Sequence, residues 1–312
     1  MSDNPNLNAV DAALLEIIAD MPGGKTEGAV NIRKDSGCAE RITTDDVDIR
    51  SKQDKPGIDI YIKAGAKKAM CHIPVIITES GLMETVYNDF YIGEGAECTI
   101  IAGCGIHNCG EDESRHDGVH TFHIGAGAHV TYVEKHYGEG DGGGARNMTP
   151  QTVAYLGEGA FLKMDTSQIK GIDSTQRDTR IVCGPKAETL VTERLQTHGA
   201  QVAVSNMEIV LDGDDARGRV ISRSVAQERS TQTFYPKMTG NAKCFGHVQC
   251  DSIIMDAAKI SSIPAIVANS TEAELIHEAA IGKIAGDQLL KLQTLGLTRE
   301  QAEDRILKGF LA

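Results

Sequence analysis

The feature that most constrains the fold is a Gly-Ala motif that recurs about every 30 residues from residue 57 onward. The four clearest copies are KAGA at 63–66, GEGA at 93–96, GAGA at 125–128 and GEGA at 157–160. Their last alanines are separated by 30, 32 and 32 residues, and weaker copies end at residues 187, 216 and 242. Each copy leads into a strand-like run in which apolar and polar residues alternate. A repeat of this length, with strands and turns but no helical pattern, predicts a solenoid.

We therefore expect a mainly β fold, a β-helix in which each coil buries its apolar face against the next coil. Glycine supplies the positive φ angle at each corner, and alanine fits the narrow interior there. A Greek-key sandwich and a set of unrelated hairpins are the alternatives. The glycine-rich run at 140–144 interrupts the repeat and is interpreted as a flexible surface loop.

The composition limits both the core and the partners. The 312 residues include 33 glycines and no tryptophan, and only 4% are aromatic, which favours stacked aliphatic side chains. A formal net charge of −13 argues against non-specific binding to nucleic acid or to an anionic membrane. No apolar run is long enough to cross a bilayer, and the acidic N-terminus lacks the basic region of a secretory signal. A cytoplasmic location is expected.

The cysteines do not suggest a disulfide framework or a zinc knuckle. Disulfides are not expected in the cytoplasm, and no C-x-x-C pair is present. Cys98, Cys104 and Cys109 are clustered, but their gaps match no common ferredoxin spacing. The expected role of a single cysteine is that of a small buried hydrophobe. The eight positions are Cys38, Cys71, Cys98, Cys104, Cys109, Cys183, Cys244 and Cys250.

The N-terminal part of the chain carries a helical pattern. Apolar residues over 7–21 recur at helical spacing, and Pro22-Gly23-Gly24 ends the helix. The Gly-Gly-Lys-Thr at 23–26 resembles the end of a phosphate-binding loop, but no strand precedes it, so nucleotide binding is rejected. We divide the chain into a short N-terminal helical and linker segment (1–56), a β-helix core (57–270) and a C-terminal helical domain (271–312).

The pattern becomes helical again after residue 281. Asp287 is expected to cap a helix that ends at Gly296. Thr298 starts a second helix, and Gln301 completes a capping box with it. The resulting helical hairpin either folds back and closes the open end of the solenoid, or docks another protein through its apolar stripe. The pattern leaves both roles open.

Metal-ligand side chains are concentrated between residues 241 and 283. This stretch offers thiolates, imidazoles and a carboxylate between alternating apolar positions. Thiolates suit iron–sulfur clusters and zinc, while a carboxylate in the same set implies weaker, exchangeable ligation. The candidate ligands are Cys250, Glu278, His277, Cys244 and His247.

Two further groups compete with this stretch. Cys104 follows Gly103 at the end of a predicted strand, and therefore at a corner of the β-helix. His116, His120 and His123 lie in one strand-like run, where alternation places His120 on the opposite face from His123. For each histidine a structural role is the alternative to ligation.

An enzyme is not expected, and no catalytic residue is assigned. The sequence contains no nucleophile elbow, no zinc-protease motif and no dinucleotide fingerprint. A carbohydrate-active β-helix enzyme would need paired carboxylates in a groove. The only candidates, Asp212, Asp214 and Asp215, lie at a turn.

The C-terminal third resembles the SufB/SufD family of iron–sulfur cluster assembly proteins. The resemblance rests on VQCDSIIM (248–255) and on HEAAIGKIAGDQLLKLQTLGLTREQAEDRILKGF (277–310), where some twenty positions match in order. A weaker match lies at Ala102-Gly103-Cys104 and at Val119-His120. The resemblance implies a right-handed parallel β-helix with a C-terminal helical domain. The histidine that SufD would place two residues after the cysteine is replaced by Ser252, so the chain is identified as a short SufB-like member.

The resemblance also implies roles for individual residues. Cys250 would be the thiolate on which a nascent cluster, of [4Fe–4S] type and transient, is built, with Glu278 as its carboxylate neighbour. Cys104 would receive sulfur and pass it through the β-helix. Helices over 287–311 would bind the ABC-type ATPase SufC. Their expected contact residues are Asp287, Gln288, Leu289, Leu292, Leu295, Ile306 and Phe310.

The implied function is that of a non-enzymatic scaffold in which SufC hydrolyses the ATP. The other expected partners are a second copy of the chain or a SufD-like paralogue, a sulfur donor (a cysteine desulfurase or sulfide), and apo iron–sulfur proteins. No flavin is expected, because the large N-terminal region of typical SufB proteins is reduced here. The Cys-Gly-x-His segment that the family often shows is replaced by Ala258-Lys259-Ile260-Ser261-Ser262. A SufD-like structural subunit without its own cluster is the alternative.

Overall fold

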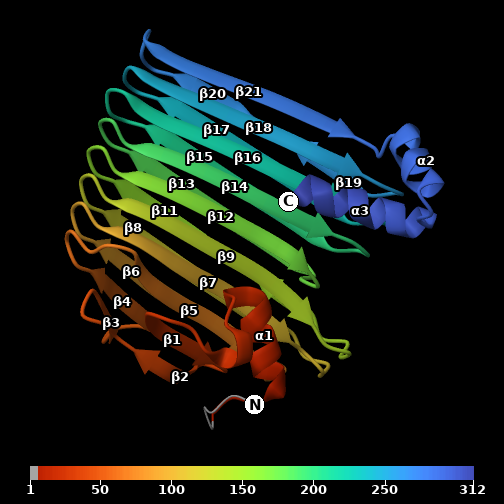
Figure 1. Cartoon of the computed structure of the whole chain (residues 1–312), viewed down its shortest axis with the longest axis horizontal. Helices are drawn as coiled ribbons and strands as arrows, with labels where there is room; N and C mark the ends of the chain where they lie inside the picture. The colour runs from red at the N-terminus through yellow and green to blue at the C-terminus, as the bar shows by residue number, and fades with distance from the viewer. Residues whose placement is uncertain (1–5) are drawn as a thin grey trace.

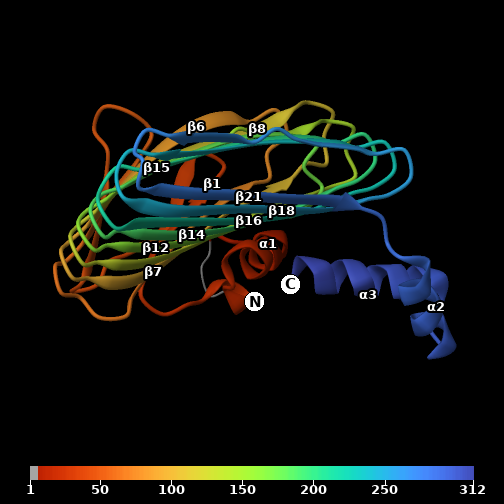
Figure 2. The same cartoon turned by 90° about the horizontal axis from the view of Figure 1, so that it is seen from above.

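A computed structural model describes residues 6–312 and shows a β-helix of about eight turns, built almost entirely from parallel strands. The fold predicted from the Gly-Ala repeat is confirmed. Figure 1 shows the coils stacked side by side, with one helix near the N-terminus and two after the last coil. Figure 2 shows that the coils form two facing sheets, and that α1 and α3 both lie outside the same sheet.

The first sheet, called sheet A, carries the predicted ligand residues. All its neighbours pair in parallel except the hairpin of β1 and β2. In spatial order its strands are β2 (Gly37–Ile42), β1 (Ala29–Lys34), β5 (Ala69–Ile77), β7 (Glu97–His107), β9 (His129–Glu139), β12 (Phe161–Lys170), β14 (Glu188–Thr197), β16 (Ala216–Ala226), β18 (Cys244–Ile254) and β21 (Ala273–Gly282).

The second sheet, called sheet B, forms the facing wall. Its strands are, in spatial order, β19 (Lys259–Ser262), β17 (Thr231–Gly240), β15 (Val202–Leu211), β13 (Ser174–Cys183), β10 (Arg146–Met148), β8 (Ser114–Ile124), β6 (Met83–Ile92), β4 (Gly57–Ile62) and β3 (Val47–Ser51). In addition, β11 (Gln151–Leu156) pairs with β8 and β13, and β20 (Ala265–Ala268) pairs with β17.

The four clearest copies of the Gly-Ala motif form corners as predicted, whereas at the weaker copies Lys186 and Asp215 take the positive φ angle in place of glycine. Gly95 and Gly127 both have a φ angle of 62°, a conformation that favours glycine. The alanines that follow the corners are buried and occupy equivalent positions in successive coils. In the last of these coils the equivalent position belongs to Cys244, which pairs with Ala216, and not to the expected Ala242.

The interior is filled by side chains that point inward from alternate positions of both sheets. The largest hydrophobic cluster runs the length of the β-helix and includes stacked Phe90 and Phe122, whose ring centroids are 4.2 Å apart. Tyr132 packs edge-on against this pair. The largest buried rings, Tyr132, Phe90 and Phe122, thus lie together near the N-terminal coils, and most of the other members of this cluster are aliphatic.

The N-terminal helix covers the outer face of sheet A. Helix α1 (Ala9–Ala19) confirms the helix predicted over 7–21 and is followed by a 3-10 turn, η1 (Pro22–Gly24). It buries Leu14 and Ile18 against β7. Gly103 permits this contact, because a Cβ there would lie 2.3 Å from the Ile18 carbonyl oxygen. Strands already begin at Ala29, inside the segment expected to be only helix and linker.

Two C-terminal helices follow the last strand. Helix α2 (Gly286–Thr294) begins after an Ala285 N-cap, so Asp287 lies in its first turn and not at the cap as predicted. Helix α3 (Arg299–Leu311) has the predicted capping box between Thr298 and Gln301. Within the described part of the chain, no helix is long and apolar enough to span a membrane.

Candidate functional site

Cys250 and His277 lie together on the inner face of sheet A at the C-terminal end of the β-helix. Cys250 belongs to β18 and His277 to the last strand, β21. In the parallel register Val248 pairs with His277 and Cys250 with Ala279, so the two side chains are diagonal neighbours on one face. The Cys250 Sγ and the His277 Nε2 are 3.5 Å apart. The structure therefore joins one thiol and one imidazole of the predicted ligand set.

The other three predicted ligands lie elsewhere. Glu278 follows His277 directly, and strand alternation turns it to the outer face, where its Oε1 lies 3.7 Å from the His247 Nε2. Cys244 is six residues before Cys250 on the same strand, roughly 20 Å away, and fills the corner position described above. Among residues 6–312, no group of three or more His, Cys, Asp or Glu side chains is arranged to hold a metal ion.

The environment of the pair favours uncharged side chains. Burial raises the pKa of the Cys250 thiol to about 11. Burial, together with the charge of His247, lowers the pKa of His277. At neutral pH the thiol therefore keeps its proton, and the imidazole keeps a free lone pair. A metal ion that binds here must displace the thiol proton, which makes its affinity dependent on pH.

Cys104 is deeply buried at the other end of the molecule. It points inward from β7, is 3% exposed, and lines an enclosed cavity of about 20 Å³ together with His116, His120 and His136. Burial, reinforced by the charges of Glu84 and Glu134, raises the pKa of its thiol well above the usual value. A macromolecular sulfur donor cannot reach this thiol from solvent without movement of the surrounding chain.

A row of polar side chains connects the two cysteine regions inside the β-helix. Successive coils place equivalent inward positions next to one another, at a spacing of roughly 4.8 Å. One such row continues from Ala102, beside Cys104, to Cys250. Its members, coil by coil, are Ala102, Glu134, Thr166, Glu193, Ser222 and Cys250.

Sequence reasoning missed this row, although a signal was present. Glu134 and Glu193 are in phase with the apolar core positions of their strands, where a charged residue is unexpected. The sequence does not give the register between coils, and it is this register that places the members of the row side by side.

Arg177 holds the row together from the opposite sheet. Its guanidinium donates to a carboxylate oxygen of Glu134 and to the Nδ1 of His136, 3.1 Å away, and its Nε lies 3.9 Å from Glu193. Ser205 and Ser222 both donate to Glu193. Burial alone would raise the pKa of Glu134, but the charges of Arg177 and His136 keep it well below the usual value. The buried Glu134 carboxylate is therefore ionised and paired with Arg177.

The three histidines of β8 have different surroundings. His116 and His120 point inward, as alternation predicts for His120. The His116 Nδ1 lies 3.1 Å from Glu84, and the His120 Nδ1 lies 2.7 Å from the Tyr132 hydroxyl. Burial lowers the pKa of His120 to about 4. His123 points outward, so the three imidazoles do not share a site.

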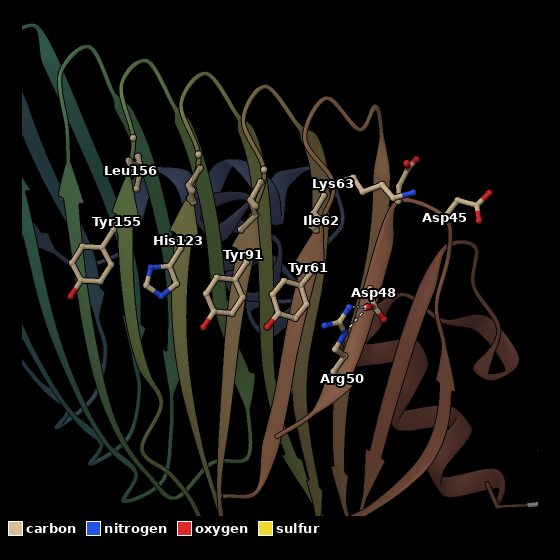
Figure 3. Close-up of a pocket in the computed structure, with 16 residues that line it drawn as sticks. Asp45, Asp48, Arg50, Tyr61, Ile62, Lys63, Tyr91, His123, Tyr155 and Leu156 are labelled. Carbon is tan, nitrogen blue, oxygen red and sulfur yellow. Dashed lines mark hydrogen bonds and ion pairs between the residues drawn. The ribbon is translucent and has the colours of Figure 1, made fainter. Parts of the chain in front are cut away.

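His123 belongs instead to an exposed ladder of rings on sheet B. Tyr61, Tyr91, His123 and Tyr155 stack on successive strands, with centroids 4.9, 5.1 and 5.8 Å apart (Figure 3). They line an open pocket of about 790 Å³. The lining also includes the carboxylates of Asp45, Asp46 and Asp48 and the Arg50 guanidinium. The Asp212, Asp214 and Asp215 side chains lie exposed at a corner, away from this pocket.

The C-terminal hairpin presents part of its apolar stripe to solvent. Arg223 of β16 fixes the end of α3 by donating to the carbonyl oxygens of Phe310 and Ala312. Leu295 is 74% exposed. Of the expected contact residues, those at the surface are Asp287, Gln288 and Leu295, and those half-buried are Leu289, Leu292, Ile306 and Phe310.

Comparison with known proteins finds one family of similar sequences. A family model described as the SufBD core domain of the SUF system for FeS cluster assembly matches residues 76–310. An iron–sulfur cluster assembly SufBD family protein of Methanothermobacter thermautotrophicus is 28% identical over 264 residues, which cover 82% of this chain and 62% of that protein. One from Methanocaldococcus jannaschii is 26% identical over 290 residues, covering 92% and 88%. One from Pyrococcus horikoshii is 41% identical over 106 residues, covering 33% and 24%.

Proposed function

This chain belongs to the SufBD family of iron–sulfur cluster assembly proteins, and we propose that it is a scaffold on which a nascent cluster is built and from which it is transferred. The observation that carries this proposal is the Cys250–His277 pair at the end of the β-helix, with a sulfur-to-nitrogen distance of 3.5 Å. A thiolate and a neutral imidazole are both iron ligands. In this role the chain is not itself an enzyme.

One chain supplies two cluster ligands, Cys250 and His277, whereas a [4Fe–4S] cluster has four iron sites. A cluster held by fewer protein ligands than it has iron sites can leave the scaffold, which its delivery to apo-proteins requires. The missing ligands would come from a second copy of the chain or from a SufD-like paralogue. The 65% exposure of Glu278 on the outer face supports a contact with such a partner rather than with the Cys250 thiol of its own chain.

The exposed end of the β-helix supports such pairing. Strand β21 has no further neighbour on one edge within the described residues, and an unpaired edge favours association. Large apolar side chains lie exposed on the last coil, where Ile263, Ile266 and Ile276 are 50%, 44% and 44% exposed. A homodimer through this end would bring two Cys250–His277 pairs toward one interface.

The C-terminal hairpin is the proposed docking element for the ATPase SufC, in the cytoplasm. It is tied to sheet A through Arg223 and α3, so a movement imposed on α2 would reach β16 and the neighbouring β18. The exposed Leu290 and Leu295 give it an apolar contact surface. ATP-driven movement of the partner could then open the interface at the cluster.

Sulfur would reach Cys250 through the interior. Cys104 and Cys250 are separated by five coil-to-coil steps, roughly 24 Å. The hydroxyl and carboxylate groups of the polar row offer hydrogen bonds along this path, and Arg177 balances the charge of Glu134 and Glu193 there. A second cavity, of about 10 Å³, lies at Thr166, Gln168 and Arg177 along this row.

A SufD-like structural subunit is the second candidate. One observation favours it: Glu278 on β21 and Cys250 on β18 point to opposite faces of sheet A. In that case the chain would bind SufC but hold no cluster.

Anaerobic reconstitution with iron and sulfide separates the two functions. Wild type, Cys250→Ala and the control Cys183→Ala, which removes another buried cysteine, are each co-purified with SufC and analysed for iron, sulfide and visible absorption. The scaffold predicts a cluster in wild type and Cys183→Ala but not in Cys250→Ala. Absence of iron from all three, with SufC retained, would instead indicate the structural subunit.

A further inference from the structure

A second cysteine site lies where β7 and β9 of sheet A end, beyond His107 and Glu139. His107 and Glu139 are the last residues of β7 and β9 and pair in register. The Cys109 Sγ lies 3.0 Å from the His107 Nε2, and the His107 Nδ1 lies 3.1 Å from a carboxylate oxygen of Glu139. The other oxygen of Glu139 accepts a hydrogen bond of 3.0 Å from the Tyr137 hydroxyl. Four side chains thus form one continuous chain of contacts that ends at a thiol.

The loop that carries Cys109 is held in place by its neighbours. Asn108 is fully buried; its amide donates to the Asp112 and Gly144 carbonyl oxygens, and its side-chain oxygen accepts from the Gly110 N–H. The glycine-rich segment at 140–144 stacks on this loop. A Cβ at Gly140 would lie 2.1 Å from the Asn108 carbonyl oxygen. The Cys109 backbone is therefore fixed, while its side chain is exposed to solvent.

Cys109, His107 and Glu139 are arranged in the sequence nucleophile, base and orienting group that is typical of an activated nucleophile. A nucleophile, a base within hydrogen-bond reach and a third group that orients the base together make a thiol reactive. Glu139 receives the Nδ1 proton of His107, so the Nε2 lone pair faces the Cys109 sulfur and can take its proton. Glu139 acts here as a positioning residue, because it acts through His107.

The other cysteines lack this combination. Six of them are buried, namely Cys71, Cys98, Cys104, Cys183, Cys244 and Cys250. Cys38 is exposed, but the contacts of its sulfur are with the Asn31 side-chain oxygen at 3.7 Å and the Glu40 carbonyl oxygen at 3.6 Å. Cys109 alone among the eight combines exposure with an imidazole partner. Cys38 is therefore a matched control within the same chain.

We propose that Cys109 is the thiol that first accepts sulfane sulfur from a persulfide donor, a step that rests on the proposed function in cluster assembly. The donor reaches Cys109 from solvent, because the thiol lies on a surface loop, whereas Cys104 is enclosed. His107 takes the Cys109 proton, and the thiolate attacks the terminal sulfur of the donor persulfide. A bond forms between Cys109 Sγ and that sulfur, and the donor's sulfur–sulfur bond breaks. The donor leaves as a thiolate that takes the proton from His107, so no external oxidant or reductant is needed.

The first test measures persulfide formation on the iron-free full chain. Wild type is treated with glutathione persulfide, trapped with an alkylating agent and analysed by peptide mass spectrometry. Cys109 is expected to be modified at least roughly tenfold faster than Cys38. In His107→Asn the Cys109 rate should fall to that of Cys38, and in Glu139→Gln it should fall in the same direction, with the Cys38 rate and the thermal midpoint unchanged. Equal rates at Cys109 and Cys38 in wild type would overturn the proposal.

The second test separates sulfur entry from cluster assembly itself. Clusters are assembled on wild type, Cys109→Ser and Cys38→Ser, using either glutathione persulfide, with unreacted persulfide removed before a reductant is added, or inorganic sulfide as the sulfur source. Only Cys109→Ser with the persulfide source should lose assembly, at least roughly tenfold in rate. Equal assembly by Cys109→Ser and wild type from persulfide would contradict the role of Cys109. Failure of wild type with both sources would count against the scaffold function and leave the result of the first test standing.

Discussion

Arg177 on β13 reaches across the interior of the β-helix and pairs with Glu134 on β9. Both side chains are almost fully buried, at 7% and 4% exposed. The pair links the two sheets at the middle of the polar row, and Glu193 lies on its other side. The interior of this β-helix is thus partly ionic, and its ionic part lies between Cys104 and Cys250.

Removing the buried Arg177 guanidinium should lower the free energy of unfolding far more than removing a surface cation on the same strand. Arg177→Met leaves Glu134 and Glu193 buried without a counter-charge, so we expect a loss of about 3–5 kcal/mol in the free energy of unfolding. Arg180→Met, three residues along β13, breaks an exposed pair with Glu208 and should cost less than about 1 kcal/mol. Chemical denaturation of both variants measures the difference, and equal losses would show that the buried pair has no special role.

Acid stability should depend on Glu84. Burial would raise its pKa, but His116 and Arg33 lower it from 4.5 to about 2. Since the folded pKa is below the unfolded one, the stabilisation is complete above pH 4.5 and is lost as the pH falls toward 2. Glu84→Gln should therefore flatten the loss of stability over this range, by on the order of 2 kcal/mol.

The control for Glu84 is Glu158→Gln, which removes an exposed carboxylate paired with Lys186. Its acid unfolding curve should stay close to that of wild type. If Glu84→Gln also follows the wild-type curve between pH 4.5 and 2, the pairing of Glu84 does not contribute to acid stability.

The close approach of α1 to β7 should depend on Gly103. Gly103→Ala places a Cβ 2.3 Å from the Ile18 carbonyl oxygen, so the helix must shift and stability should fall by about 1–3 kcal/mol. Gly309→Ala in α3 meets no atom within 4 Å and should be neutral or slightly stabilising, because alanine favours helices. Thermal unfolding distinguishes the two, and a neutral Gly103→Ala would mean that α1 is not held at this contact.

Binding of SufC should depend on the exposed leucines of the hairpin. Leu295→Ser removes a side chain that is 74% exposed, so it should weaken SufC binding at least roughly tenfold without lowering the thermal midpoint. Met83→Ser changes another exposed apolar residue, 58% exposed at the opposite end of the β-helix, and should leave binding unchanged. Calorimetric titration with SufC measures both. Unchanged affinity in Leu295→Ser would remove the hairpin from the docking surface.

The local sequence pattern was enough to predict the coils. The features that it did not predict depend on which residues of neighbouring coils pair with one another. The corner alanines and α1 follow from composition and periodicity, because corners and amphipathic faces are local features. The identity of Cys244 as a corner residue depends on its pairing with Ala216, which the irregular spacing of the later repeats obscured.

The candidate ligands show the same limit. Alternation along β21 separates His277 from Glu278, and this could have been deduced from their adjacency within a strand. The proximity of Cys250 to His277 needs the register of β18 against β21. The side-chain contacts of Cys109 with His107, and of His107 with Glu139 on the next coil, needed three-dimensional placement as well.

The most direct test of the central claim is whether the His277 Nε2 ligates the cluster beside Cys250. The protein is labelled with ¹⁵N-histidine, reconstituted anaerobically, reduced and examined by pulsed electron paramagnetic resonance. We predict a ¹⁵N hyperfine coupling in wild type and in His247→Ala, whose imidazole lies on the outer face, and its loss in His277→Ala. A wild-type cluster without nitrogen coupling, or a coupling that persists in His277→Ala, would contradict the account.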